Sequence, residues 1–126
     1  IRILRGMGAS VTVAARSYGS LAEIEAEGCR AVRTDALKTS VKAADVVINT
    51  VPARMLTEPV LSALKHDALV IDLASRPGGV DLAAAGRLGV KTIWALSLPG
   101  KTAPITAGEI ILHTIENCLS ELEEAV

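Results

Sequence analysis

The sequence predicts an α/β fold built on a doubly wound parallel sheet, with helices on both faces of that sheet. Three observations predict it. Short apolar runs alternate along the chain with stretches of helical spacing. Half of the 126 residues are hydrophobic yet none is Phe, so Ala, Val, Leu and Ile must form the core. Residues 67–81 pass from an apolar run into a Ser-Arg-Pro-Gly-Gly loop and then reach Asp81, a typical helix N-cap.

The predicted elements follow one another in a single domain, residues 1–126, without linker or repeat. Residues 1–9 resemble the end of a helix that Gly6 or Gly8 stops. Strands are expected at 11–15, 30–34, 45–51, 68–73 and 90–96, of which 45–51 and 68–73 are apolar enough to be buried on both faces. Helices are expected at 21–27, 39–44, 56–64, 82–88 and 106–124, with a loop at 97–101. The last helix carries a stripe that we expect to be buried: Ile110, Ile111, Thr114, Ile115, Cys118, Leu119 and Leu122.

Charge and composition argue against several classes of protein. The formal net charge is −1, and one Trp and one Tyr are the only aromatic residues, so nucleic-acid binding is not expected. The sequence has no run of 18 apolar residues and no signal-peptide pattern, and we expect a cytoplasmic protein without membrane contact. Cys29 and Cys118 are far apart in the sequence, which predicts two small buried thiols and no metal site.

The first candidate site lies at Arg16 and Ser17, where the strand at 11–15 ends. In a Rossmann-like, NAD(P)-binding fold, the end of the second strand meets the adenosine ribose. An acidic residue there suits NAD, and a basic residue suits the 2′-phosphate of NADP. No carboxylate follows before Glu23. Because a guanidinium and a hydroxyl together suit a phosphate, the sequence predicts NADP as the cofactor. The alternative is a solvated loop arginine.

Two further strand ends are candidates for contact with the cofactor. Polar residues end the otherwise apolar strand at 45–51, and in this fold that place faces the second ribose and the nicotinamide. The loop at 72–79 follows the central buried strand and borders the same site. Cofactor contacts are therefore expected from Asn49, Thr50, Val51 and Pro52, and from Leu73, Ala74 and Ser75. The alternative is that Asn49 and Thr50 only cap their own loop.

Three residues are candidates for binding the substrate. Arg76 lies in a glycine-containing loop that lets the backbone approach a ligand, and its guanidinium suits a carboxylate. Lys101 is the only ionisable residue in the loop before the last helix, and Thr106 lies where that helix begins and its free N–H groups suit an anion. The alternative for Arg76 and Lys101 is an exposed surface position. Asp72 has no expected catalytic role, and no catalytic base is identified.

Four motifs carry a resemblance to a known family. They are residues 11–17, 47–52, 71–81 (Ile-Asp-Leu-Ala-Ser-Arg-Pro-Gly-Gly-Val-Asp) and 94–109. With them the chain resembles, over essentially its whole length, the nucleotide-binding C-terminal domain of the A subunit of dipicolinate synthase. The resemblance implies an NADP-linked oxidation of a dihydrodipicolinate-type intermediate to dipicolinate during sporulation. It also implies a flavoprotein partner, the B subunit of dipicolinate synthase, and a place in the mother-cell cytoplasm of a spore-forming bacterium.

The chain departs from that family in one respect. The family has an N-terminal domain and then a first strand whose Gly-rich turn holds the pyrophosphate, but the sequence contains no GxGxxG motif. We expect a fragment that lacks the central strand between those at 11–15 and 45–51, with apolar edges that favour association into a homo-oligomer. The isolated fragment is expected to be inactive and to bind NADP poorly, and micromolar affinity in calorimetry would refute this.

Two alternative functions remain open. One is a non-catalytic Rossmann-like module that docks a partner or senses a nucleotide, because the phosphate turn is missing. The other is a related NAD(P)-dependent dehydrogenase of the hydroxyacid or shikimate type, or an adenosylhomocysteinase-like domain. Hydroxyacid dehydrogenases need a histidine after the proline that corresponds to Pro99, and here Gly100 follows, which argues against alcohol–ketone chemistry.

Overall fold

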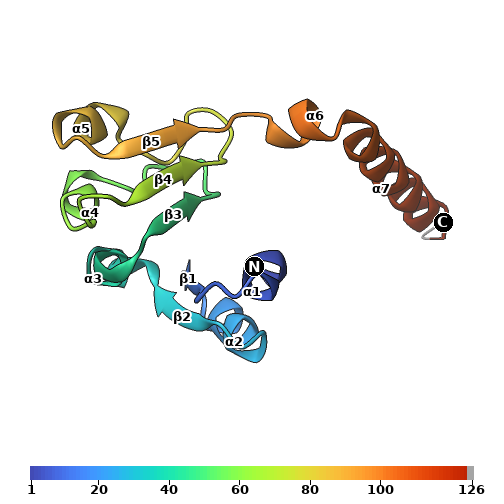
Figure 1. The fold of residues 1–126 in the computed structure, drawn as a ribbon. Helices are drawn as coiled ribbons and strands as arrows, with labels where there is room; N and C mark the ends of the chain where they lie inside the picture. The colour runs from blue at the N-terminus through green and yellow to red at the C-terminus, as the bar shows by residue number, and fades with distance from the viewer. Residues whose placement is uncertain (125–126) are drawn as a thin grey trace.

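The computed structural model describes residues 1–124, in which short strands alternate with helices (Figure 1). The five strands are β1 (Thr12–Ala15), β2 (Arg30–Arg33), β3 (Val46–Asn49), β4 (Leu69–Asp72) and β5 (Lys91–Trp94). The α-helices are α1 (Arg2–Gly6), α2 (Tyr18–Ala26), α3 (Leu37–Ser40), α4 (Glu58–Leu61), α5 (Leu82–Arg87), α6 (Leu98–Thr102) and α7 (Pro104–Glu124). Two 3₁₀ turns, Thr34–Ala36 and Val41–Ala43, flank α3.

All strand pairs among the described residues are parallel, which confirms the predicted parallel α/β fold. β1 pairs with β2, and β3, β4 and β5 form a second sheet in that order. In the second sheet Asn49 lies beside Asp72, and Asp72 lies beside Trp94. Since the strands are parallel, their carboxyl ends lie at one edge of that sheet, and we refer to it below as the carboxyl edge.

β1 and β3 do not pair with each other, and a gap separates the two sheets (Figure 1). Residues of β1, β2 and β3 line a cavity of about 150 Å³ in this gap. The sequence predicted a missing central strand at this gap between the two sheets. In the described residues the gap is not closed by pairing of β1 with β3. The prediction that 45–51 is buried on both faces is wrong, because Val46 is 50% exposed and Ile48 is 40% exposed.

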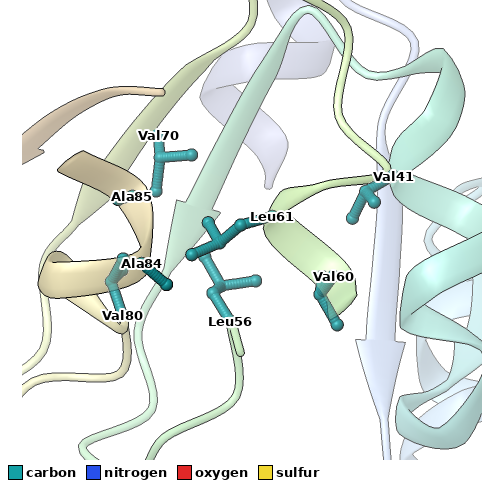
Figure 2. Packing of buried hydrophobic residues seen from close by; sticks show 8 residues of the cluster. All are labelled: Val41, Leu56, Val60, Leu61, Val70, Val80, Ala84 and Ala85. Carbon is teal, nitrogen blue, oxygen red and sulfur yellow. The ribbon is translucent and has the colours of Figure 1, made fainter. Parts of the chain in front are cut away.

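The core lies on one face of the three-stranded sheet, where α4 and α5 cover it. Figure 2 shows its side chains grouped between these helices and the strands. Leu61 of α4 is 1% exposed, Val70 of β4 is fully buried, and Ala84 and Ala85 allow α5 to come close to the sheet. The sequence predicted a core of Ala, Val, Leu and Ile; this cluster contains the first three, while Ile24 is buried outside it, on α2. Its members are Val41, Leu56, Val60, Leu61, Val70, Val80, Ala84 and Ala85.

The C-terminal part differs from the prediction in two ways. The segment 97–101 was expected to be a loop but is largely helical, since it contains most of α6. Ser97, just before this helix, has a left-handed backbone conformation (φ 58°). The stripe on α7 is exposed, because α6 and α7 extend away from the strands and nothing described covers them (Figure 1). The exposed members are Ile110, Ile111, Thr114, Ile115, Cys118 and Leu119, while the side chain of Leu122 lies outside those that the structure describes. Cys29 is buried as expected, whereas Cys118 is not.

Among residues 1–124, no helix combines the length and the apolar character that crossing a membrane requires.

The core makes a direct prediction about stability. Leu61→Ala should lower the free energy of unfolding of the full-length protein by about 2–5 kcal/mol, because it leaves a cavity under α4 that the surrounding helices cannot fill. Leu88→Ala is the matched control, since Leu88 is 41% exposed and should cost much less. Urea denaturation of both variants measures the difference. Equal losses would contradict the placement of Leu61 in the core.

Candidate functional site

A buried carboxylate joins two neighbouring strand ends at the carboxyl edge. Asp72 ends β4 and Asn49 ends β3, and the two are partners in the sheet register. Asp72 is 2% exposed and Asn49 is 7% exposed. Asn49 Nδ2 donates to Asp72 Oδ1 at 2.8 Å and to the carbonyl of Val51 at 2.9 Å. The side chains of two different strands therefore hold each other in place.

The backbone of the following loop also donates hydrogen bonds to Asp72. The N–H of Ala74 donates to Oδ1 at 3.0 Å, and the N–H of Gly79 donates to Oδ2 at 2.8 Å. We call Asp72, Asn49, Ala74 and Gly79 the Asp72 cluster. Asp72 thus accepts from nearby backbone N–H groups and from Asn49, which the sequence assigned to the cofactor.

The charge of Asp72 is stabilised by the cluster. Burial alone would raise the pKa of this carboxyl, but the hydrogen bonds from Asn49 and from the backbone of Gly79, Ala74 and Val80 outweigh burial, and the pKa is lowered. Because folding lowers this pKa, the ionised carboxylate stabilises the folded state at pH values above the pKa that the same carboxyl has in the unfolded chain. That stabilisation is lost as the pH falls through the lower, folded-state value. At neutral pH, Asp72 is therefore an ionised acceptor.

Gly79 allows the loops after β3 and β4 to touch. A Cβ built on Gly79 would lie 2.6 Å from the carbonyl oxygen of Val51 and would collide with the Asn49 amide. The carbonyl of Gly79 accepts from the N–H groups of Met55 and Leu56 at 3.0 and 2.9 Å. Only glycine fits here, and it fixes the two loops against each other.

Arg76 lies at the same edge, against the single Trp. Its guanidinium carbon is 5.7 Å from the centre of the Trp94 ring, a cation–π distance. Trp94 Nε1 donates to the carbonyl of Ala74 at 3.0 Å, which ties the ring to the Asp72 cluster. Arg76 itself is exposed. Sequence reasoning missed Trp94, since only the strand register brings it beside this loop.

A second group of residues surrounds a cavity of about 390 Å³ near the end of β1, and we call it the Arg16 cavity. Its walls come from the segments that follow β1 and β2, from α3, and from the loop after β3 together with α4. It is lined by Arg16, Thr34, Asp35, Leu37, Lys38, Arg54, Met55, Thr57 and Val60. Apart from Arg16, sequence reasoning missed these residues, because they come together only through the fold.

Arg33 organises the wall next to Arg16. Its Nη1 donates to the carbonyl of Arg16 at 3.3 Å, and its Nε donates to Asp35 Oδ2 at 3.1 Å. Its guanidinium carbon also lies 5.4 Å from the centre of the Tyr18 ring. Ser17 caps α2, since its Oγ accepts from the N–H of Ser20 at 3.1 Å. Asp35 supplies the carboxylate that lines the cavity, and this carboxylate is already paired with Arg33.

The structure brings some of the predicted site residues together and leaves others apart. Asn49, Val51 and Ala74 make bonds in or beside the Asp72 cluster. The other predicted cofactor contacts in these two loops are exposed: Thr50, Pro52, Leu73 and Ser75. Lys101 on α6 and Thr106 in the first turn of α7 are exposed on the segment that extends away from the strands (Figure 1). Nothing described in residues 1–124 groups His, Cys, Asp and Glu as a metal site would require.

The chain is similar to several known proteins. The profile of the family "Alanine dehydrogenase/PNT, C-terminal domain" matches residues 1–83. The A subunit of dipicolinate synthase from Bacillus subtilis is 43% identical over 122 residues, which are 97% of this chain and 41% of that protein. The chain therefore spans about two fifths of the length of this relative.

Solved structures agree with the sequence comparison. The crystal structure of the same Bacillus subtilis protein superposes with a TM-score of 0.87 at 42% identity, covering 99% of this chain and 42% of that one. The corresponding dipicolinate synthase protein from Bacillus halodurans superposes with a TM-score of 0.86 at 37% identity, covering 94% and 40%. The fold is thus a Rossmann-like, NAD(P)-binding fold.

The close contact at Gly79 is open to test. Gly79→Ala should separate the two loops and lower the free energy of unfolding by at least about 2 kcal/mol, because the added methyl meets backbone and a buried amide. Gly86→Ala is the control: Gly86 lies in α5 with open space around it, and alanine there should leave stability unchanged or raise it by up to about 1 kcal/mol. Thermal unfolding compares the two, and a tolerated Gly79→Ala would contradict the close approach.

Proposed function

The chain belongs to the family of alanine dehydrogenase/PNT C-terminal domains, and on this basis we propose that it is the NADP-binding domain of a dipicolinate synthase, in its A subunit. The family supports an oxidoreductase-type domain that binds a nicotinamide cofactor. The proposed reaction of the whole protein is the NADP-linked oxidation of a dihydrodipicolinate-type intermediate to dipicolinate. The likeness to the Bacillus subtilis protein supports this choice of substrate.

The observation that carries the choice of NADP is the charge around the Arg16 cavity. Three cations line it, namely Arg16, Lys38 and Arg54, and its one carboxylate, Asp35, is already paired with Arg33. A site built for NAD would present a free carboxylate to the ribose hydroxyl, whereas the 2′-phosphate of NADP needs cations. The donors present therefore fit NADP, with Arg16 and Ser17 at its phosphate.

The other proposed contacts follow the carboxyl edge. The loops after β3 and β4 hold the nicotinamide half of the cofactor, through Asn49, Thr50, Val51, Pro52, Leu73, Ala74 and Ser75. The Asp72 cluster keeps these loops at a constant separation, so the chain contributes position rather than proton transfer at this point. NADP, when bound, supplies the acceptor for the hydride that the oxidation removes.

For the substrate we propose recognition by its carboxylates. Arg76 presents a guanidinium at the carboxyl edge, restrained by the ring of Trp94. Lys101 and Thr106 remain proposed contacts from α6 and α7, the segment that extends away from the strands (Figure 1). They therefore act on a substrate only if α6 and α7 lie close to the edge in the whole protein.

Further proposals concern the setting of the domain. Residues 1–126 form one partial dinucleotide-binding domain, which alone is inactive and binds NADP poorly. The whole protein works with a flavoprotein, the B subunit of the synthase, forms a homo-oligomer, and acts in the mother-cell cytoplasm during sporulation. The relative is named as one subunit of its synthase, which supports the existence of a partner.

One observation favours a second function. The apolar side chains of α7 are exposed along successive turns, as in a helix that docks onto another protein surface. A non-catalytic module that docks a partner through α7 would need no cofactor. Cofactor binding by the full-length protein separates this function from the first.

The role of Arg16 predicts a change in cofactor preference. In the full-length enzyme, Arg16→Ala should raise KM for NADP by about tenfold or more, because one charged contact to the 2′-phosphate is lost. KM for NAD should change little. Initial rates with each cofactor and the dihydro substrate measure both. Arg87→Ala is the control, since Arg87 pairs with Glu58 at 2.8 Å on the surface and does not line the Arg16 cavity. An unchanged preference for NADP in Arg16→Ala would contradict the assignment.

The role of Arg76 predicts an effect on the substrate alone. Arg76→Ala should raise KM for the dicarboxylate by about tenfold, and Arg76→Lys should recover only part of it, because an ammonium cannot bind a carboxylate in the planar bidentate way. Affinity for NADP, measured by calorimetry, should stay within about twofold of wild type. A loss of NADP affinity equal to the loss of substrate affinity would show that Arg76 serves the cofactor instead.

A further inference from the structure

Arg54 also lines the Arg16 cavity, and the sequence did not connect it with the 2′-phosphate of NADP. It belongs to the loop between β3 and α4, whereas Arg16 follows β1. Its side chain is 70% exposed, and its ion-pair partner is Asp81, at 3.6 Å. Two arginines from separate parts of the chain thus line one cavity.

The rest of the cavity lining is suited to an adenosine. Leu37, Met55 and Val60 provide an apolar wall, and Val60 belongs to the buried core. A cavity of about 390 Å³ is within the size range of small-molecule sites. A purine packs against apolar side chains. A phosphate beside it is held more strongly by two cations than by one when the site is open to water, because solvent and salt weaken each charged contact.

We propose that Arg54 is a specificity-determining residue that binds the 2′-phosphate of NADP together with Arg16. This inference rests on the proposed function and adds a second arginine to it. The phosphate lies between the two guanidinium groups, one from each side of the gap between the sheets. Occupation of the cavity by NADP therefore links the β1–β2 unit to the β3–β5 unit.

The present partner of Arg54 does not prevent this role. The Arg54–Asp81 contact is long for an ion pair and joins an exposed guanidinium to a carboxylate that has another partner. Asp81 Oδ1 accepts from the N–H of Ala84 at 3.0 Å and so caps α5. When Arg54 turns to a phosphate, Asp81 keeps its cap, and neither group is left buried without a partner.

A binding experiment tests the inference without turnover. Calorimetry on the full-length protein compares adenosine 2′,5′-bisphosphate, ADP and 5′-AMP, of which only the first carries a 2′-phosphate. Arg54→Ala and Arg16→Ala should each weaken binding of the bisphosphate by about tenfold. Their affinities for ADP and 5′-AMP should stay within about twofold of the wild-type values. Arg54→Lys should recover part of the loss. Arg87→Ala is the matched control and should bind all three like wild type.

The other outcomes are distinct. If Arg54→Ala binds the bisphosphate like wild type while Arg16→Ala does not, the inference about Arg54 is wrong and the proposed NADP function stands. If Arg54→Ala weakens all three ligands equally, Arg54 contacts the adenosine or the 5′-phosphate that the three share, and the 2′-phosphate assignment is wrong. If the wild type does not prefer the bisphosphate to 5′-AMP, the proposed use of NADP fails together with the inference.

Discussion

The ionised carboxylate of Asp72 is the constraint on which the carboxyl edge of this domain depends. It lies at the end of a strand with 2% of its surface exposed, a position that is unfavourable unless the charge is fully hydrogen-bonded. Asn49 and the N–H groups of Ala74 and Gly79 provide those bonds. The need to satisfy one buried charge therefore fixes the ends of two strands and the loops that follow them.

The proposed binding surface follows from this constraint. The loop after β4 carries Arg76, and the loop after β3 carries Arg54, so both arginines sit on backbone that the Asp72 cluster holds. Arg16 comes from the β1–β2 unit, which no strand pairing joins to β3 in the described residues. A dinucleotide that contacts all of these loops would bridge the gap, which gives ligand binding a direct effect on how the two sheets are held together.

Much of the fold could be predicted from sequence because parallel strands that are covered by helices read as apolar runs between loop signals. The Ser-Arg-Pro-Gly-Gly run after a buried strand also marked the loop at 72–79 as a border of the site. The pairing of Asn49 with Asp72 could not be predicted, since it depends on strand register, nor could the place of Arg54, which depends on the packing of α4 beside α3. The exposed stripe of α7 shows the same limit: helical spacing tells which side chains share a face, and not what covers that face.

Amide hydrogen exchange in full-length Asp72→Asn tests the central claim most directly. If Asp72 holds both loops, the segments 50–56 and 73–81 should exchange faster together in the variant, because an amide in place of the carboxylate cannot accept from Asn49, Ala74 and Gly79 at once. The segment 12–26, which contains β1 and α2, should keep its wild-type exchange and so exclude general unfolding. Faster exchange confined to 73–81, or no change in either loop, would contradict the claim that this one carboxylate organises the site.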